Sequence, residues 1–292
     1  MELIKRVSVV STGGVRIRPE HMESTGSPML WWLLTSHRWT TPLPIYVYVI
    51  EHEQGRVLFD TELDRASLID PGYYQCGLVR RTYTKMARFA IGPQQTLTEQ
   101  LRGIGYEPGQ VRTVVLSHLH PDHIGGLAEV SGAEIVVSAR EWAQPDAPFP
   151  TAKGLLRSHI DLPGLRCTRV IPAPVDDESI AQFTASHDLF GDGSLVLVAT
   201  PGQTPGSLSL LLRQPGMPPI LFVGDLCYST GLLERGAVPG IGARRRLRES
   251  SRAVAELTRR NRGLMVMPAH DPLAAARLRR ALGDRTRTRA RA

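Results

Sequence analysis

The sequence predicts an α/β fold, an αββα sandwich in which helices flank two mixed β-sheets. Short apolar runs rich in β-branched residues, typical of buried strands, recur in both halves of the chain with helical segments between them. With 292 residues, 42% of them hydrophobic, the chain is long enough to bury one large core. No internal repeat or obvious linker divides it, so we expect a single domain over residues 1–276.

In the first half, Gly13-Gly14 lies between two strand-like segments and predicts an opening hairpin. Thr96 to Glu99 has the pattern of a capping box, and Leu97, Leu101 and Ile104 mark one face of the helix that follows. Residues 19–43, rich in proline, are expected to be irregular. Strands are expected at residues 3–10, 15–18, 45–50, 56–59, 111–116 and 134–138.

The second half repeats the pattern after a proline-rich segment, residues 144–164, which we expect to form a lid. Strands are predicted at residues 195–199, 208–212, 220–223 and 264–267, with a helix at 250–261. Seven arginines and one aspartate in residues 277–292 carry +6 of the net charge of +7, which leaves only +1 for the body. We interpret this Arg-rich tail as disordered and solvated, and expect no nucleic-acid partner.

Three histidines and an aspartate, His118, His120, Asp122 and His123, follow directly after the strand predicted at 111–116. His118 and His120 are two residues apart, so they point the same way in extended backbone. Imidazole and carboxylate groups are ligands for zinc and similar metals, and only nine histidines occur in the whole chain. The cluster therefore predicts a metal site at the end of a strand.

This His-x-His-x-Asp-His motif resembles the signature of the metallo-β-lactamase superfamily, most of whose members are two-metal hydrolases. The resemblance implies the metallo-β-lactamase fold and two divalent metal ions, most often Zn²⁺, with Fe or Mn as alternatives. Asp60, at the end of the strand at 56–59, matches the aspartate that orients a ligand in the family. The family pattern there is Asp-Thr-Gly, and this sequence has Glu62 in place of the glycine, which alters a tight turn.

Further ligands follow from the resemblance, at the ends of the strands in the second half. The first metal would bind His118, His120 and position 203, and the second would bind Asp122, His123 and His270, with Asp225 bridging both. Position 203 is Gln203 where the family has histidine. An amide oxygen is a poorer ligand for zinc than imidazole, so we expect a weakened first site. A site abolished by this substitution is the alternative.

Tyr228, three residues after Asp225, narrows the resemblance to the N-acyl homoserine lactone lactonases, which are quorum-quenching enzymes. The implied activity is opening of a lactone or related ester by a hydroxide that bridges the metals. Tyr228 would bind the carbonyl oxygen and Asp122 would pass a proton to the leaving alkoxide. Alternatives are a thioester or phosphodiester hydrolase, or a non-catalytic binding relative. Met29, Trp31 and Trp32 are candidates for contact with the acyl chain.

The cysteines and the apolar segments bear on the cellular location and the oligomeric state of the protein. Three widely spaced cysteines, Cys76, Cys167 and Cys227, are typical of reduced thiols rather than of a disulfide framework. No apolar run is long enough to span a bilayer, and no secretory signal is evident. We therefore expect a cytoplasmic protein. The apolar, Trp-rich segment 29–34 favours a homodimer.

Overall fold

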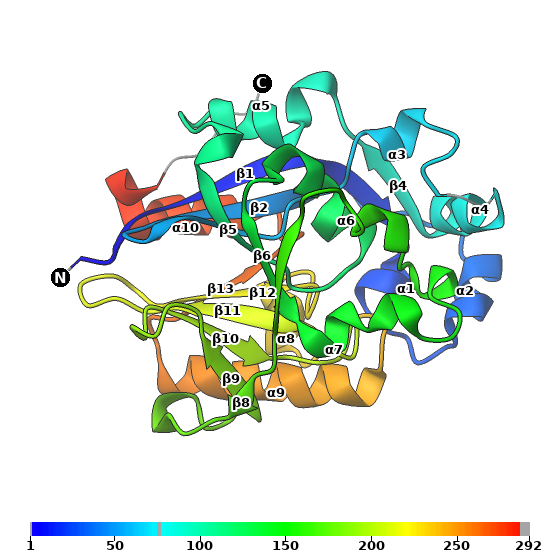
Figure 1. Cartoon of the computed structure of the whole chain (residues 1–292). Coiled ribbons are helices and arrows are strands. Elements are labelled where there is room, and N and C mark those ends of the chain that lie inside the picture. Colours follow the sequence, from blue (N-terminus) through cyan, green and yellow to red (C-terminus); the bar gives the residue numbers. More distant parts are fainter. Residues whose placement is uncertain (1, 75–76, 287–292) are drawn as a thin grey trace.

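The computed structural model describes residues 2–74 and 77–286. Two β-sheets pack face to face, with helix α5 outside the first sheet and α9 outside the second, as Figure 1 shows. The prediction of an αββα sandwich is confirmed. Within the described residues, no helix has the length and apolar character needed to cross a membrane. Cys167 and Cys227 are free thiols, and Cys76 lies outside the described residues.

The first sheet has seven strands in the order β4-β1-β2-β3-β5-β6-β7. The pairs β1–β4, β1–β2 and β2–β3 are antiparallel, and β3, β5, β6 and β7 run parallel to one another. The sheet is therefore mixed, as predicted. Its strands are β1 (Ile4–Ile17), β2 (Leu43–His52), β3 (Gly55–Phe59), β4 (Ala87–Ala90), β5 (Val111–Val115), β6 (Glu134–Ser138) and β7 (Arg166–Val170).

The second sheet has six strands in the order β13-β12-β11-β10-β9-β8, and only β12 and β13 pair in parallel. This sheet supplies the later candidate ligands from its loops. Its strands are β8 (Ala173–Pro174), β9 (Ala185–Asp188), β10 (Leu195–Ala199), β11 (Leu208–Leu212), β12 (Ile220–Gly224) and β13 (Met265–Pro268).

The α-helices are α1 (Pro19–Met22), α2 (Met29–Thr35), α3 (Ala66–Ile69), α4 (Gly77–Met86), α5 (Leu97–Arg102), α6 (Pro121–Ile124), α7 (Ala139–Trp142), α8 (Thr230–Glu234), α9 (Arg244–Arg260) and α10 (Ala274–Leu282).

Strand β2 contributes side chains to two hydrophobic cores, one on each face of the first sheet. Tyr48 and Ile50 point into the core between the sheets, where they join Phe222 of β12. Val47 and Val49 alternate to the outer face, against a cluster that contains Leu97 of α5. Because both faces of the strand are covered, its apolar residues run without the polar alternation of a half-exposed strand.

The opening hairpin predicted around Gly13-Gly14 is wrong. Residues on both sides of Gly13 belong to one long strand, β1, and pair with the same partner, β2. The register shifts between Ser11 and Gly14, and Gly13 has φ = 132°. The glycine pair therefore forms a bulge within a continuous strand instead of a turn between two strands.

The Arg-rich tail begins later than predicted. Residues up to Leu282 continue helix α10, in which Ala274, Leu278 and Leu282 are buried beside the core between the sheets. These residues are four apart and share one helical face, so burial outweighs the high charge of the segment. Arg277 bonds the buried Asp271 at 2.8 Å. Residues 287–292 lie outside the described residues.

Candidate metal centre

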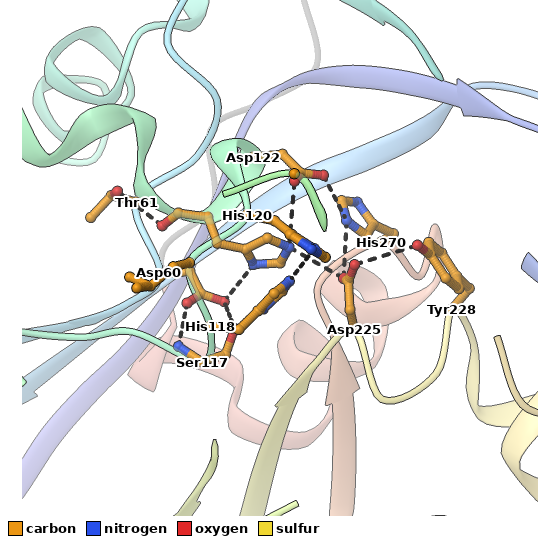
Figure 2. Close-up of polar contacts among 12 residues, drawn as sticks. Asp60, Thr61, Ser117, His118, His120, Asp122, Asp225, Tyr228 and His270 are labelled. Carbon is orange, nitrogen blue, oxygen red and sulfur yellow. Dashed lines mark hydrogen bonds and ion pairs between the residues drawn. The ribbon is translucent and has the colours of Figure 1, made fainter. Parts of the chain in front are cut away.

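The candidate ligands gather at one end of the two sheets. His118 and His120 follow β5, and Pro121 opens the short helix α6 that carries Asp122 and His123. Asp225 and His270 follow β12 and β13. These two strands are parallel neighbours, so their ends meet. Figure 2 shows His118, His120 and Asp122 from the first sheet pointing toward Asp225 and His270 from the second.

Asp225 lies at the centre of the cluster. Its Oδ1 is 3.3 Å from His123 Nε2 and 3.2 Å from His270 Nε2. The Asp122 carboxylate approaches the same two nitrogens, at 3.9 Å and 3.7 Å. His118 Nε2 and His120 Nδ1 are 2.9 Å apart. The resemblance implies seven ligands. Six of them, all except Gln203, thus lie within a few ångströms of another candidate ligand.

Two groups of donor atoms have the spacing of a metal site, with all donors of a group within 4.8 Å of one another. One is Asp122, His123 and His270, which matches the expected second metal. The other is His118, His123 and Asp225. This second group differs from the expected first-metal set, because it contains His123 and lacks His120 and Gln203. Asp225 belongs to it and lies 3.2 Å from His270 of the other group, a position that suits a bridging carboxylate.

The ligands are held from behind by hydrogen bonds to atoms that face away from the cluster. Asp60 accepts hydrogen bonds from the Ser117 backbone N–H at 2.7 Å and hydroxyl at 2.8 Å, and its Oδ2 lies 2.8 Å from His123 Nδ1. The Ser117 hydroxyl is also 2.9 Å from His118 Nδ1. His270 Nδ1 lies 2.8 Å from the Pro44 carbonyl. Such contacts fix the ring orientation and leave Nε2 free to bind a cation.

The histidines of the cluster differ in the direction in which their pKa is shifted. Burial, together with His123 and His120, lowers the pKa of His118 well below its usual value, which keeps the ring neutral. Burial also lowers the pKa of His123, but Asp225, Asp60 and Asp122 outweigh it and raise the pKa well above the usual value. Metal ligands must be deprotonated, so a cation between these carboxylates would take the place of a proton on His123.

Gln203 lies in the loop between β10 and β11, is more than nine-tenths buried, and lines the same hollow as His120, Asp122 and Asp225. Its Oε1 makes no hydrogen bond among the described residues, and neither do His123 Nε2 and Asp225 Oδ1. Buried polar atoms without partners are costly. A set of imidazole, carboxylate and amide donors with several unsatisfied atoms therefore fits a divalent metal such as zinc.

Tyr228 lies beside the cluster and contacts a residue that the sequence motifs do not reveal. Its hydroxyl is 3.4 Å from Asp225 Oδ2 and 3.0 Å from Nε2 of His21, which comes from helix α1. Burial, with Asp225 and Asp122, raises the pKa of Tyr228 well above its usual value and keeps the phenol protonated. Burial lowers the pKa of His21 to about 4, so its ring is neutral.

The buried carboxylate of Glu141, on α7, joins the two ligand loops. It accepts hydrogen bonds from the backbone N–H of Leu119, which lies between His118 and His120, and from Thr204 Oγ1 and the backbone N–H of Gly206. The distances are 3.1, 2.6 and 3.1 Å. Glu141 therefore fixes the loop that carries Gln203 against the histidine motif. No short sequence motif identifies it.

Glu62 keeps the backbone conformation of the glycine that it replaces. Its φ is 95°, a left-handed value that favours glycine, and Asp60 is also left-handed at 61°. The Glu62 carboxylate is buried and accepts the N–H of Leu97 at the start of α5, at 2.8 Å. The Glu62 side chain therefore stabilises this turn, because its carboxylate caps the start of a helix that packs on the sheet.

An apolar cavity of about 440 Å³ opens onto the cluster. Met29 of α2 lines it, whereas Trp31 and Trp32 are not among its lining residues. Trp31 is largely exposed, and Trp32 is buried with its ring stacked 6.1 Å from His21. No sequence motif marks the other apolar lining residues, which come mainly from β1, α2, α4 and β4: Val15, Ile17, Leu30, Leu33, Leu34, Val79, Met86 and Phe89.

Residues 40–270 match the family model of the metallo-beta-lactamase superfamily. The chain belongs to this superfamily. It is therefore an enzyme, a hydrolase of a family that binds divalent metals, as the sequence analysis predicted.

Two relatives of known sequence have the names of hydrolases. The N-acyl homoserine lactonase AttM of Azorhizobium caulinodans is 31% identical over 236 residues, which cover 79% of this chain and 82% of that protein. The probable metallo-hydrolase Rv2300c of Mycobacterium tuberculosis is 30% identical over 239 residues, 78% of this chain and 74% of that protein.

The fold is that of solved lactonases. A point mutant of AiiA from B. thuringiensis, determined with N-decanoyl-L-homoserine bound at its active site, superimposes with a TM-score of 0.72 at 20% identity. The match covers 92% of this chain and 94% of that one. The dizinc lactonase AidC gives a TM-score of 0.63 at 14% identity, with 91% and 87% coverage.

Proposed function

We propose that this hydrolase opens the ring of an N-acyl homoserine lactone or a closely related ester. The observation that carries the proposal is the phenol of Tyr228 at the edge of the ligand cluster, facing the apolar cavity that opens there. The relatives named as N-acyl homoserine lactonases support the same substrate class. An acyl chain would lie against the apolar lining and bring the lactone carbonyl to Tyr228.

The residues of the chain take distinct roles in this proposal. The protonated phenol of Tyr228 donates a hydrogen bond to the carbonyl oxygen, where negative charge develops during attack by water. Asp122, which faces the cavity, passes a proton to the departing alkoxide. His118, His120, Asp122, His123, Gln203, Asp225 and His270 would hold two divalent cations, with zinc the best fit to the donors. When bound, these cations supply a Lewis acid and a water molecule of lowered pKa.

The direct test is metal analysis of the purified protein beside a substrate panel of lactones, simple esters, thioesters and phosphodiesters. We expect about two equivalents of metal at saturation and the highest kcat/KM for lactones with an apolar acyl chain. A higher kcat/KM for the thioester or phosphodiester members would assign the site to one of those reactions instead.

Gln203→His is expected to raise metal occupancy, because imidazole is a better zinc ligand than an amide oxygen. We expect the first-metal affinity to rise about 10- to 100-fold, a range typical of changes around a metal site. Metal content is measured after dialysis against a graded series of chelator concentrations. Gln144→His is the matched control, since Gln144 is a nearby cavity residue away from the ligand cluster. Equal occupancy in Gln203→His and the unmodified protein would remove position 203 from the metal site.

His21→Phe is expected to lower kcat about tenfold with little change in KM, because the phenol of Tyr228 loses the ring that orients it. His21 Nδ1 is buried without a hydrogen bond, and a bare acceptor is tolerated there better than an unpaired N–H. The proton then sits on Nε2, which donates to the phenol oxygen of Tyr228. The phenol O–H donates to Asp225 Oδ2 at 3.4 Å, a long hydrogen bond that a substrate carbonyl can replace.

Phenylalanine preserves the packing of His21 against Trp32 and Tyr228. A double-mutant cycle with Tyr228→Phe separates orientation from general structural damage. If His21 acts through Tyr228, the second substitution adds little to the loss caused by the first. Fully additive losses would show that His21 acts independently of the phenol.

A further inference from the structure

A second cavity, of about 740 Å³, lies beside the apolar one and differs from it in the number of cationic side chains in its lining. Four cationic side chains line it: Arg140 of α7, Lys153, and Arg244 and Arg246 of α9. Its lining contains no aspartate or glutamate among the residues that the structure describes. A concave surface with one sign of charge attracts ions of the opposite sign.

The two cavities meet at the candidate metal centre. Five residues line both of them: Met29, His120, Lys153, Gln203 and Ile241. Two of these, His120 and Gln203, are the candidate ligands of the first metal. A molecule reacting at the centre would thus have an apolar region on one side of its carbonyl and a cationic region on the other.

The cations of the second cavity are available to a ligand. Within the described part of the chain, the side chains of Arg140, Lys153 and Arg244 form no ion pair, and Arg246 reaches Glu249 of its own helix only at 3.7 Å. All four residues are exposed. They are therefore free to reorient toward an anion, although solvent and salt weaken each contact.

The backbone adds positive potential at the same place. Helix α9 has 17 residues and begins at Arg244, and Ala243 at its N-cap has no side chain that accepts a hydrogen bond. The first backbone N–H groups of such a helix lack partners and favour a negative charge. The buried Gln203, whose amide oxygen makes no hydrogen bond among the described residues, lies where this cavity joins the metal centre. That oxygen accepts a donor or a cation, so an anion would lie away from it, toward the arginines.

We propose that this second cavity binds an anionic group of the substrate. The inference rests on the proposed function and narrows its substrate class to related esters and lactones that carry a negative charge, because an unmodified N-acyl homoserine lactone is neutral. The preferred substrate is an ester or lactone with an apolar acyl chain on one side of the reacting carbonyl and a carboxylate, phosphate or sulfonate on the other. The chain occupies the apolar cavity, and the anion lies between Arg140, Lys153 and the start of α9.

The first experiment compares two aryl esters of one medium-chain acid, one with a neutral leaving phenol and one whose phenol carries a sulfonate. The metal-loaded protein is expected to prefer the sulfonated ester. In Arg244→Ser/Arg246→Ser, the ratio of kcat/KM for the sulfonated ester to that for the neutral ester is expected to fall about tenfold. The preference is also expected to shrink as ionic strength rises.

Arg245→Ser/Arg248→Ser is the matched control. It removes the same charge from the same turns of α9, but neither residue lines the cavity. The control should retain the substrate ratio of the unmodified protein. An equal fall of the ratio in both double variants would overturn the proposal, because it would reflect net charge alone. An unchanged ratio in Arg244→Ser/Arg246→Ser would overturn it as well.

A binding measurement separates this inference from the proposed reaction. A medium-chain alkyl sulfonate, whose head group binds metals weakly, is titrated calorimetrically into each protein. We expect binding to weaken about tenfold in Arg244→Ser/Arg246→Ser and to persist in the control. If sulfonate binding weakens as expected but no lactone is hydrolysed, the anion site is supported and the proposed function is wrong. If lactones are hydrolysed but both variants bind the sulfonate alike, the anion pocket fails alone.

Discussion

Asp225→Asn lowers metal content from about two equivalents to about one and decreases kcat/KM by about 1,000-fold; this is the largest loss of activity that we expect. Asp225 Oδ1 lies between Nε2 of His123 and Nε2 of His270, close to both groups of candidate ligands. An amide has the same shape but no charge, so it cannot bridge two cations as a carboxylate does. Metal analysis and steady-state kinetics check this result.

The free energy of unfolding of the metal-free protein is the accompanying measurement for Asp225→Asn. Although burial opposes the charge of this carboxylate, His123 and His270 hold its pKa well below the usual range, so the folded protein favours the charged form and the neutral amide should lower the stability of the metal-free protein near neutral pH. Asp177→Asn serves as a control, since Asp177 pairs with Arg213 at 2.6 Å outside the ligand cluster. Two tightly bound metals in Asp225→Asn would contradict its bridging position.

Glu141→Ala is expected to have the largest effect on stability, a loss of about 3–5 kcal/mol in the free energy of unfolding. Removal of the carboxylate leaves the N–H groups of Leu119 and Gly206 and the hydroxyl of Thr204 without their acceptor. Each buried group left unpaired costs about 1–3 kcal/mol. Denaturant unfolding measures the change.

Glu141→Ala should also weaken metal binding, because the loop that carries Gln203 is no longer tied to the histidine motif. Thr204→Val is a graded control that removes one of the three hydrogen bonds to Glu141, at 2.6 Å, together with the 2.7 Å hydrogen bond between the Thr204 and Ser207 hydroxyls. It should cost about 1 kcal/mol and retain most of the metal. A loss in Glu141→Ala no greater than that in Thr204→Val would show that the carboxylate does not join the two loops.

The fold could be predicted well where one physical signal dominates. The apolar runs of β2, β5, β10 and β11 are buried on both faces, so length and β-branching sufficed to predict strands. The helix predicted at 250–261 begins earlier, at Arg244, because three arginines at its start carry no apolar periodicity. Segment 19–43 contains α1 and α2, helices of four and seven residues that are too short to show a clear period.

The candidate site was predictable only for the residues that belong to a local motif. Spacing identifies His118, His120, Asp122 and His123, and resemblance adds Asp225 and His270, which the structure brings beside them. His21 and Glu141 were not predicted, because their partners are distant in the sequence. His21 hydrogen-bonds to Tyr228, and Glu141 hydrogen-bonds to Leu119 and Thr204. Single buried polar residues carry no sequence signal of their own; only three-dimensional contacts reveal their partners.

The division of the ligands between the two sheets has a thermodynamic consequence. One sheet supplies His118 to His123, and the other supplies Asp225 and His270, so neither half of the chain holds a complete coordination sphere. Ions bound here cross-link the halves of the sandwich and favour the native state by mass action, by about 2.7 kcal/mol per site at a free concentration of 100 times Kd. Resistance to heat should therefore depend on the supply of metal in the surroundings, and chelation should loosen the whole molecule and not just its catalytic end.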